Sequence, residues 1–161
     1  MPDHNNSLAR FLTMSAELTG FTEFRLTGTG MAADYLQAAT QVVGEDVMLG
    51  LLDAFAALPD GGTDERDAAL RATILSDELL GPVARNIIKM WYVGTWYELP
   101  SDWRESFGAH DRDSTFVVSA MAYTEGLLWP AVDANPPGVK GPGYGTWADP
   151  PKIPGRGETD A

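Results

Sequence analysis

The chain of 161 residues has no cysteine and only two histidines, His4 and His110. Without thiols it forms neither disulfides nor thiolate metal sites, and it has no cysteine nucleophile. It is also poor in positive charge: 11 Lys and Arg stand against 23 Asp and Glu, which gives a formal net charge of -12. Because nucleic acids and anionic membranes attract basic surfaces, the composition argues against both as partners.

Long hydrophobic runs are also missing. No stretch of about 18 apolar residues is present, so no membrane-spanning helix is predicted. The residues Met1 to Asn6 are polar and show neither an apolar signal core nor a twin arginine, which leaves a cytoplasmic location open. Apolar residues make up 44% of the chain and charged residues 21%, near the averages of globular proteins. We therefore expect one folded domain.

Apolar side chains at helical spacing run from residue 7 to residue 94. Ser7 fits a helix N-cap, and Pro82 fits the first position of a helix. The predicted helices have the approximate ranges 8–19, 32–43, 46–58, 64–74 and 82–93. No two-residue alternation is sustained, so the predicted fold class is all-α.

The second half of the chain is less regular. Residues 95–115 show no clear period and predict a long connection. A last helix is predicted from Val117 to Trp129, because Pro130 forces an end there. Together these patterns predict a compact helical domain of about five to six helices over residues 1–132.

The residues 133–161 predict a long, irregular C-terminal arm. The last 28 residues contain six Pro and six Gly, together with Tyr144 and Trp147. Prolines lower the entropy cost of an extended shape and aromatic rings supply anchor area, so we expect the arm to bind a partner. The alternative is that it folds back over Trp91 and Trp129 of its own helices.

Motifs for catalysis are weak. Gly28–Ala33 satisfies the letters G-x-G-x-x-A, but a dinucleotide fingerprint needs a preceding strand and a parallel sheet, and here helices are predicted on both sides. His110, Asp111 and Asp113 form a His and carboxylate cluster, and Asp60–Glu65 faintly resembles a calcium loop. Neither has the ligand number or spacing of a metal site. We interpret both as solvated loop charges.

Four stretches of the chain, in this order and spacing, carry a resemblance to a known family. They are Phe11–Gly20, Ile87–Trp96, Ala122–Trp129 and Pro142–Pro151. Over roughly residues 8 to 152 the chain resembles the small subunit of bacterial FAD-dependent sugar and polyol dehydrogenases, typified by membrane-bound sorbitol, fructose and glucose dehydrogenase complexes.

This resemblance implies a non-catalytic role. In that family a large subunit of the glucose–methanol–choline oxidoreductase type holds FAD and oxidises the sugar, and many members add a multihaem cytochrome c. The small subunit helps the large one fold and mature, and commonly carries a twin-arginine signal for export. For this chain the resemblance implies a periplasmic or periplasm-facing heterodimer, with FAD in the partner and no catalytic, cofactor-binding or metal-binding residue of its own.

Aromatic residues of the second half are the candidates for partner contact. We predict that the partner-binding residues are Trp96, Tyr123, Trp129, Tyr144, Trp147 and Pro150. Two other function classes stay open: a small helical enzyme that uses Glu125 or His110, and a binding module that holds a small ligand at the Trp-rich surface.

Overall fold

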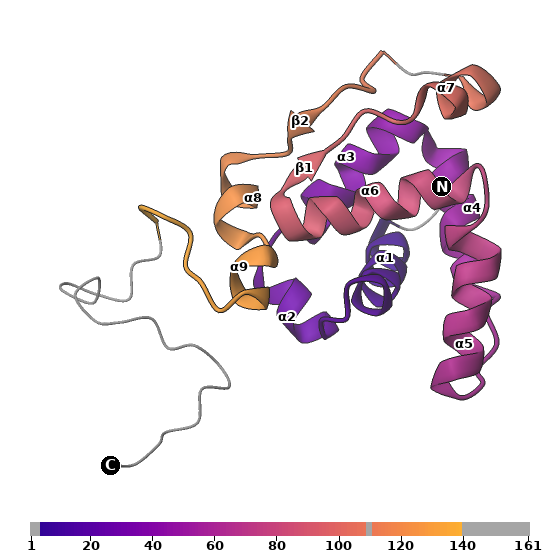
Figure 1. The fold of residues 1–161 in the computed structure, drawn as a ribbon, viewed down its shortest axis with the longest axis horizontal. Coiled ribbons are helices and arrows are strands. Elements are labelled where there is room, and N and C mark those ends of the chain that lie inside the picture. The colour runs from indigo at the N-terminus through magenta and orange to yellow at the C-terminus, as the bar shows by residue number, and fades with distance from the viewer. Residues whose placement is uncertain (1–3, 109–110, 140–161) are drawn as a thin grey trace, which may run out of the picture.

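The structure is a computed structural model and describes residues 4–108 and 111–139 (Figure 1). About 67% of the described residues are helical, which confirms the predicted all-α class. In chain order the elements are α1 (His4–Thr19), α2 (Glu23–Gly28), α3 (Ala32–Val43), α4 (Glu45–Ala56), α5 (Thr63–Leu70), the π-helix η1 (Arg71–Leu75), α6 (Leu80–Val93), β1 (Thr95–Trp96), α7 (Ser101–Phe107), β2 (Phe116–Val117), α8 (Ala120–Glu125) and α9 (Leu128–Ala131).

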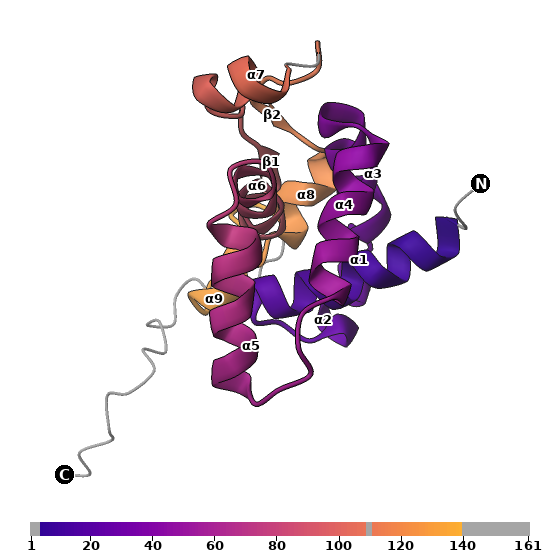
Figure 2. The same cartoon turned by 90° about the vertical axis from the view of Figure 1, so that its right-hand side faces the viewer.

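Helix α6 lies at the centre of the fold and contacts α1, α3 and α4 (Figures 1 and 2). Its Trp91 side chain is 1% exposed. The Phe11 ring of α1 stacks beside Trp91 at a centroid distance of 6.3 Å, and the Tyr35 ring of α3 meets it edge-on at 4.9 Å. Aromatic pairs in this geometry add to the free energy of apolar burial. Because Trp91 is already covered, it needs no further cover from the C-terminal residues.

Several helix starts differ from the prediction. Ser7 lies inside α1 and is not its N-cap. The short helix α2 was not predicted, and its N-cap is Thr22, whose hydroxyl accepts a hydrogen bond from the Arg25 N–H. Pro82 is the third residue of α6, not the first. The Asp77 carboxylate accepts the backbone N–H groups at the start of α6, so this acid replaces proline as the start signal.

The predicted helix over residues 64–74 changes its hydrogen-bond pattern at Arg71, where α5 gives way to η1. The guanidinium of Arg85 donates a hydrogen bond of 2.6 Å to the carbonyl of Leu75, at the end of η1. This bond satisfies a helix-end acceptor and ties η1 to α6. Figure 2 shows α5 extending away from the body of the molecule.

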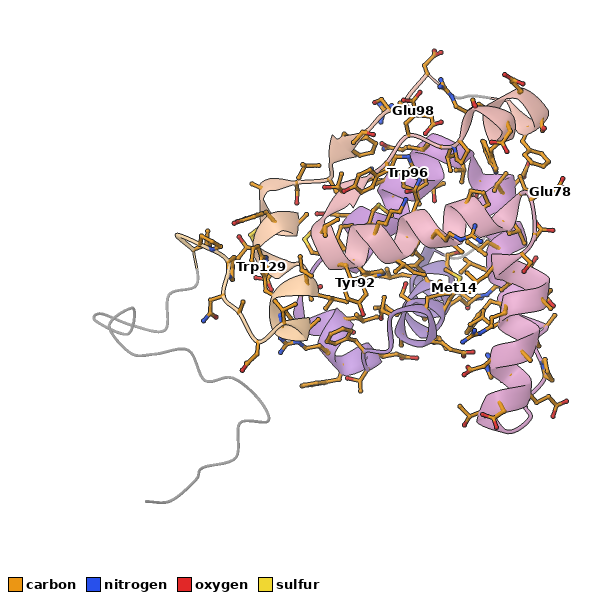
Figure 3. All side chains as sticks on the ribbon, viewed as in Figure 1. Met14, Glu78, Tyr92, Trp96, Glu98 and Trp129 are labelled. Atoms are coloured by element: carbon orange, nitrogen blue, oxygen red, sulfur yellow. The ribbon has the colours of Figure 1, made fainter. Side chains whose placement is uncertain are left out.

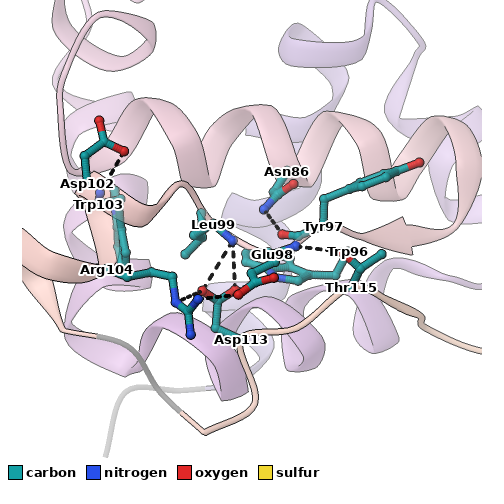
Figure 4. A network of polar contacts seen from close by, with 10 residues as sticks. All are labelled: Asn86, Trp96, Tyr97, Glu98, Leu99, Asp102, Trp103, Arg104, Asp113 and Thr115. Carbon is teal, nitrogen blue, oxygen red and sulfur yellow. Dashed lines mark hydrogen bonds and ion pairs between the residues drawn. The ribbon is translucent and has the colours of Figure 1, made fainter.

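The predicted connection over residues 95–115 contains β1 and the helix α7. The strands pair antiparallel, with Trp96 opposite Phe116. Asp113, which is 5% exposed, accepts hydrogen bonds from Trp96 Nε1 at 3.3 Å and from the Leu99 N–H at 3.1 Å (Figure 4). Arg104 Nε lies 3.3 Å from Asp113 and forms an ion pair with it. The interpretation of Asp113 as a solvated loop charge is therefore wrong.

The predicted helix from Val117 to Trp129 is divided. Residues Phe116 and Val117 pair with β1, and the helical part splits into α8 and α9 at Gly126. Among the described residues, no helix combines the length and the apolar character that crossing a bilayer requires.

Candidate partner-binding surface

Three of the four stretches that carry the family resemblance contact one another, although they are far apart in the sequence. The N–H of Leu127 donates a hydrogen bond of 2.9 Å to the carbonyl of Trp91. The Tyr92 hydroxyl donates one of 2.9 Å to the carbonyl of Thr19, at the end of α1. Figure 3 shows Tyr92 at the end of α6 that lies nearer to Trp129. These stretches therefore form one structural junction, in which α8 and α9 are held against the end of α6.

Gly126 fits this junction because it has no side chain. A Cβ atom at Gly126 would lie 2.8 Å from the Tyr92 carbonyl oxygen, closer than real Cβ contacts allow. The next residue, Leu127, is 1% exposed and fills the core. The break between α8 and α9 therefore packs against α6. The opposite faces of these two short helices point away from α6.

Trp129 and Tyr123 form a pair on the outside of the junction. Trp129 Nε1 donates a hydrogen bond of 2.7 Å to the Tyr123 carbonyl, and the two rings meet edge-on with centroids 5.4 Å apart. Tyr123 is exposed and Trp129 is half-buried. Because the indole N–H is already satisfied, the remaining open area of this pair suits apolar contact.

Exposed apolar side chains are frequent in the segment that contains this pair. In the described part of the chain, ten large hydrophobic residues are exposed, and six of them lie between residues 117 and 139. We call these six the α8–α9 surface: Val117, Met121, Tyr123, Leu128, Val132 and Val139. The exposed apolar residues of the described chain are therefore concentrated in the segment from β2 to the end of the described residues, whereas single exposed apolar residues are ordinary elsewhere.

The charge of this segment is one-sided. Residues 113 to 139 contain no Lys or Arg, and their acids are Asp113, Glu125 and Asp133. Asp113 is neutralised by Arg104 in the interior, whereas Asp133 is exposed and Glu125 half-buried. Of these three acids, Asp133 is therefore the one whose side chain is exposed.

The first residues of the predicted arm remain attached to α9. The Ala134 N–H donates a hydrogen bond of 2.8 Å to the Trp129 carbonyl, and Pro136 is buried. Asp133 has a backbone φ of +52°, which turns the chain at the end of α9. The described residues that follow α9 therefore begin with a turn that is bonded back to Trp129.

The structure divides the predicted partner-binding residues into three groups. Tyr123 belongs to the α8–α9 surface, and the half-buried Trp129 packs against it. Trp96 is 0% exposed, so its assignment to a contact surface is wrong: strand pairing and the Asp113 carboxylate enclose its ring. The remaining three lie outside the described residues: Tyr144, Trp147 and Pro150.

Five aliphatic members of the surface were missed: Val117, Met121, Leu128, Val132 and Val139. Three of them, Val117, Met121 and Leu128, fall within the single helix predicted from Val117 to Trp129. That helix is divided at Gly126, and the signal that could have found the division is a glycine shortly before a proline, with apolar residues between them.

Tyr35 is a tyrosine of α3 whose phenol is buried beside Trp91. Its hydroxyl has no hydrogen-bond partner among the described residues, and the side chain is 1% exposed. Burial raises the pKa of the Tyr35 phenol above its ordinary value, and the nearby charges of Asp34 and Glu125 raise it further. The phenol therefore stays protonated and uncharged at neutral pH.

His110, one of the candidates for an independent enzyme, lies outside the described residues. Glu125 is half-buried at the end of α8. Over residues 4–108 and 111–139, no group of three or more His, Asp or Glu side chains is placed to hold a metal ion. No protein-family model, curated protein or solved structure matches this chain.

Proposed function

We propose that this chain is a non-catalytic small subunit that binds and stabilises the FAD-dependent catalytic subunit of a sugar or polyol dehydrogenase and assists its maturation or export. The observation that carries the proposal is the concentration of exposed apolar side chains on the α8–α9 surface. The resemblance in the sequence supplies the partner class, a flavoprotein of the glucose–methanol–choline type. A multihaem cytochrome c subunit and a periplasm-facing complex belong to the same proposal.

The burial of the resembling stretches supports a structural role for them. Phe11, Trp91 and Leu127 are all in the core, and none presents a reactive group to solvent. Residues that hold α8 and α9 in place would be needed in every protein that presents this surface to a partner. A structural role therefore accounts for these residues, and no catalytic step by this chain is needed to explain them.

Co-expression tests the proposal. The chain is produced with the flavoprotein expected to be encoded beside it, and that flavoprotein is also produced alone. We expect the chain to raise both the soluble yield and the flavin content of the flavoprotein, because a bound subunit shifts the folding equilibrium toward the state it binds. Equal yield and flavin content in both preparations would contradict the proposal.

A binding module for a small ligand is the second candidate, and one observation favours it. A cavity of about 500 Å³ is lined by residues that include Glu125 and Trp129, and this volume lies in the range of small-molecule sites. The behaviour of the isolated chain separates the candidates. A self-sufficient module is expected to be monodisperse alone, whereas a subunit with an open apolar surface is expected to self-associate until its partner is added.

A further inference from the structure

The cavity lies beside the α8–α9 surface. It has α2 on one side and residues 124–136 on the other. Its walls include the aromatic residues Phe24 and Trp129, and Pro130 and Pro136 add apolar area. Figure 1 shows α2 and α9 next to each other, and residues of both line the cavity. The cavity is therefore a groove between α2 and α9, and it shares Trp129 with the Tyr123–Trp129 pair.

Phe24 is the most exposed large apolar side chain of the described residues, at 90%. It occupies the second position of α2, a helix that is fixed by the Thr22 cap and by the buried Leu26. A phenylalanine exposed to this extent contributes almost nothing to the burial that stabilises the fold. Covering it fully would gain the apolar transfer free energy of a large ring, which makes it a strong anchor for a second molecule.

The polar residues of the groove set its charge preference. Glu125 and Asp133 are acidic, and Arg25 is the one basic residue among those that line the groove. Thr29, which also lines it, is already satisfied: its hydroxyl donates to the Leu26 carbonyl at 2.7 Å and accepts from the Met31 N–H at 3.1 Å. The charged groups of the groove are thus mainly acidic and lie among apolar and aromatic side chains.

We propose that this groove, between Phe24 on α2 and Trp129 on α9, receives an apolar segment of the flavoprotein subunit that carries a Lys or Arg. The inference rests on the proposed function and adds the place and the chemistry of the contact. Two features of the molecule select this occupant. Trp129, which lines the groove, packs against Tyr123 of the α8–α9 surface, and the exposed acid Asp133 complements a basic side chain.

Substitution of Phe24 tests the inference in the complete chain, co-expressed with the flavoprotein. Phe24→Ala is expected to weaken the association at least tenfold, because truncation of a buried aromatic anchor commonly has an effect of this size. Phe107→Ala is the matched control, since Phe107 is also exposed but lies on α7, at another end of the molecule (Figure 1). It is expected to leave the affinity within twofold. An affinity of the Phe24→Ala variant within twofold of the unchanged chain would overturn the inference.

The variant Asp133→Asn tests the charge preference of the groove. It keeps the shape of the side chain, and asparagine tolerates the positive φ at this position. We expect it to weaken the association by about twofold to fivefold and to reduce the loss of affinity with added salt. An unchanged affinity and salt dependence would overturn the assignment of a basic partner residue.

Photo-crosslinking identifies the occupant directly. A benzophenone amino acid at position 24 is expected to crosslink to the flavoprotein. A crosslink only to residues 140–161 of the same chain, or only to a second copy, would overturn the inference. If the unchanged chain does not associate with the flavoprotein at all, the proposed function fails as well. If the unchanged chain associates with the flavoprotein, but substitution at position 24 leaves the affinity unchanged and a crosslinker there does not reach the flavoprotein, only the present inference fails.

Discussion

Gly94, the C-cap of α6, touches Ala122 of α8 so closely that a Cβ atom at Gly94 would lie 2.7 Å from the Ala122 backbone and from its methyl group. Gly94 also has a φ of +70°, a left-handed conformation that side chains disfavour. The contact fixes the distance between the end of the central helix and the helix that begins the α8–α9 surface.

Gly94→Ala is expected to destabilise the fold by about 3 kcal/mol, because it adds a backbone clash to the cost of the left-handed conformation. Gly20→Ala is the matched control: Gly20 has a φ of +76°, but no atom of the described residues lies within 4 Å of the place that an alanine Cβ would take. We expect about 1 kcal/mol there. Urea unfolding followed by circular dichroism measures both, and equal losses would show that the contact with Ala122 relaxes without cost.

Asp113→Asn is expected to destabilise the chain by about 2 kcal/mol, since a charged acceptor of several hydrogen bonds becomes an amide with one acceptor oxygen. The donors left behind include Trp96 Nε1 and the N–H of Leu99, both buried. Asp111→Asn is the control, because Asp111 is exposed two residues away. The free energy of unfolding from denaturant titration checks the pair, and similar values for both variants would argue against the network in Figure 4.

Tyr35→Phe is expected to leave stability at neutral pH unchanged or slightly higher, because the hydroxyl it removes is buried without a partner among the described residues. The unchanged chain should lose stability as the pH rises above about 10, where the unfolded tyrosine ionises while the raised pKa keeps Tyr35 protonated in the fold. The Phe variant should lose less over that range. Tyr97→Phe, an exposed position, controls for the loss of a phenol. Thermal unfolding between about pH 8 and pH 11 measures the difference, and parallel curves would contradict it.

Trp147→Ala is expected to weaken association with the flavoprotein at least tenfold and to leave the helical content of the isolated chain nearly unchanged. The prediction concerns a residue outside the described part of the chain and tests the C-terminal arm as an anchor. Thr146→Ala is the neighbouring control. Unchanged affinity would show that the arm is a linker, and loss of the isolated fold would show that Trp147 belongs to the core.

The sequence predicted those elements whose signals are local. The bounds of α3 follow from its apolar spacing and from Gly44, which ends it. Helix α2 escaped prediction because it has six residues and exposes Phe24 where an amphipathic pattern requires a polar side chain. Short helices of this kind depend on a cap and on one buried residue, which a periodicity analysis does not detect.

The candidate site was predicted only in part, because some of its residues are placed by contacts that local patterns in the sequence do not show. Tyr123 and Trp129 lie near each other in the sequence, and their rings meet although they belong to two short helices, α8 and α9. Trp96 was misplaced because its burial depends on Asp113, which lies 17 residues later in the chain, and on a strand partner in β2. A pairing between two-residue strands leaves no alternating pattern to find.

The hydrogen bond from the Leu127 N–H to the Trp91 carbonyl joins a residue that is synthesised late to one that is synthesised earlier. Trp91 leaves the ribosome before the residues that seal its end of the helix, and Trp96 before the carboxylate of Asp113. A growing chain therefore holds Trp96 without its final cover until Asp113 and β2 have been made, and the end of α6 at Trp91 without its cover until Leu127 has been made. The last part of the fold to be made is the part that presents the α8–α9 surface, so a nascent chain gains that surface only when its own core is closed.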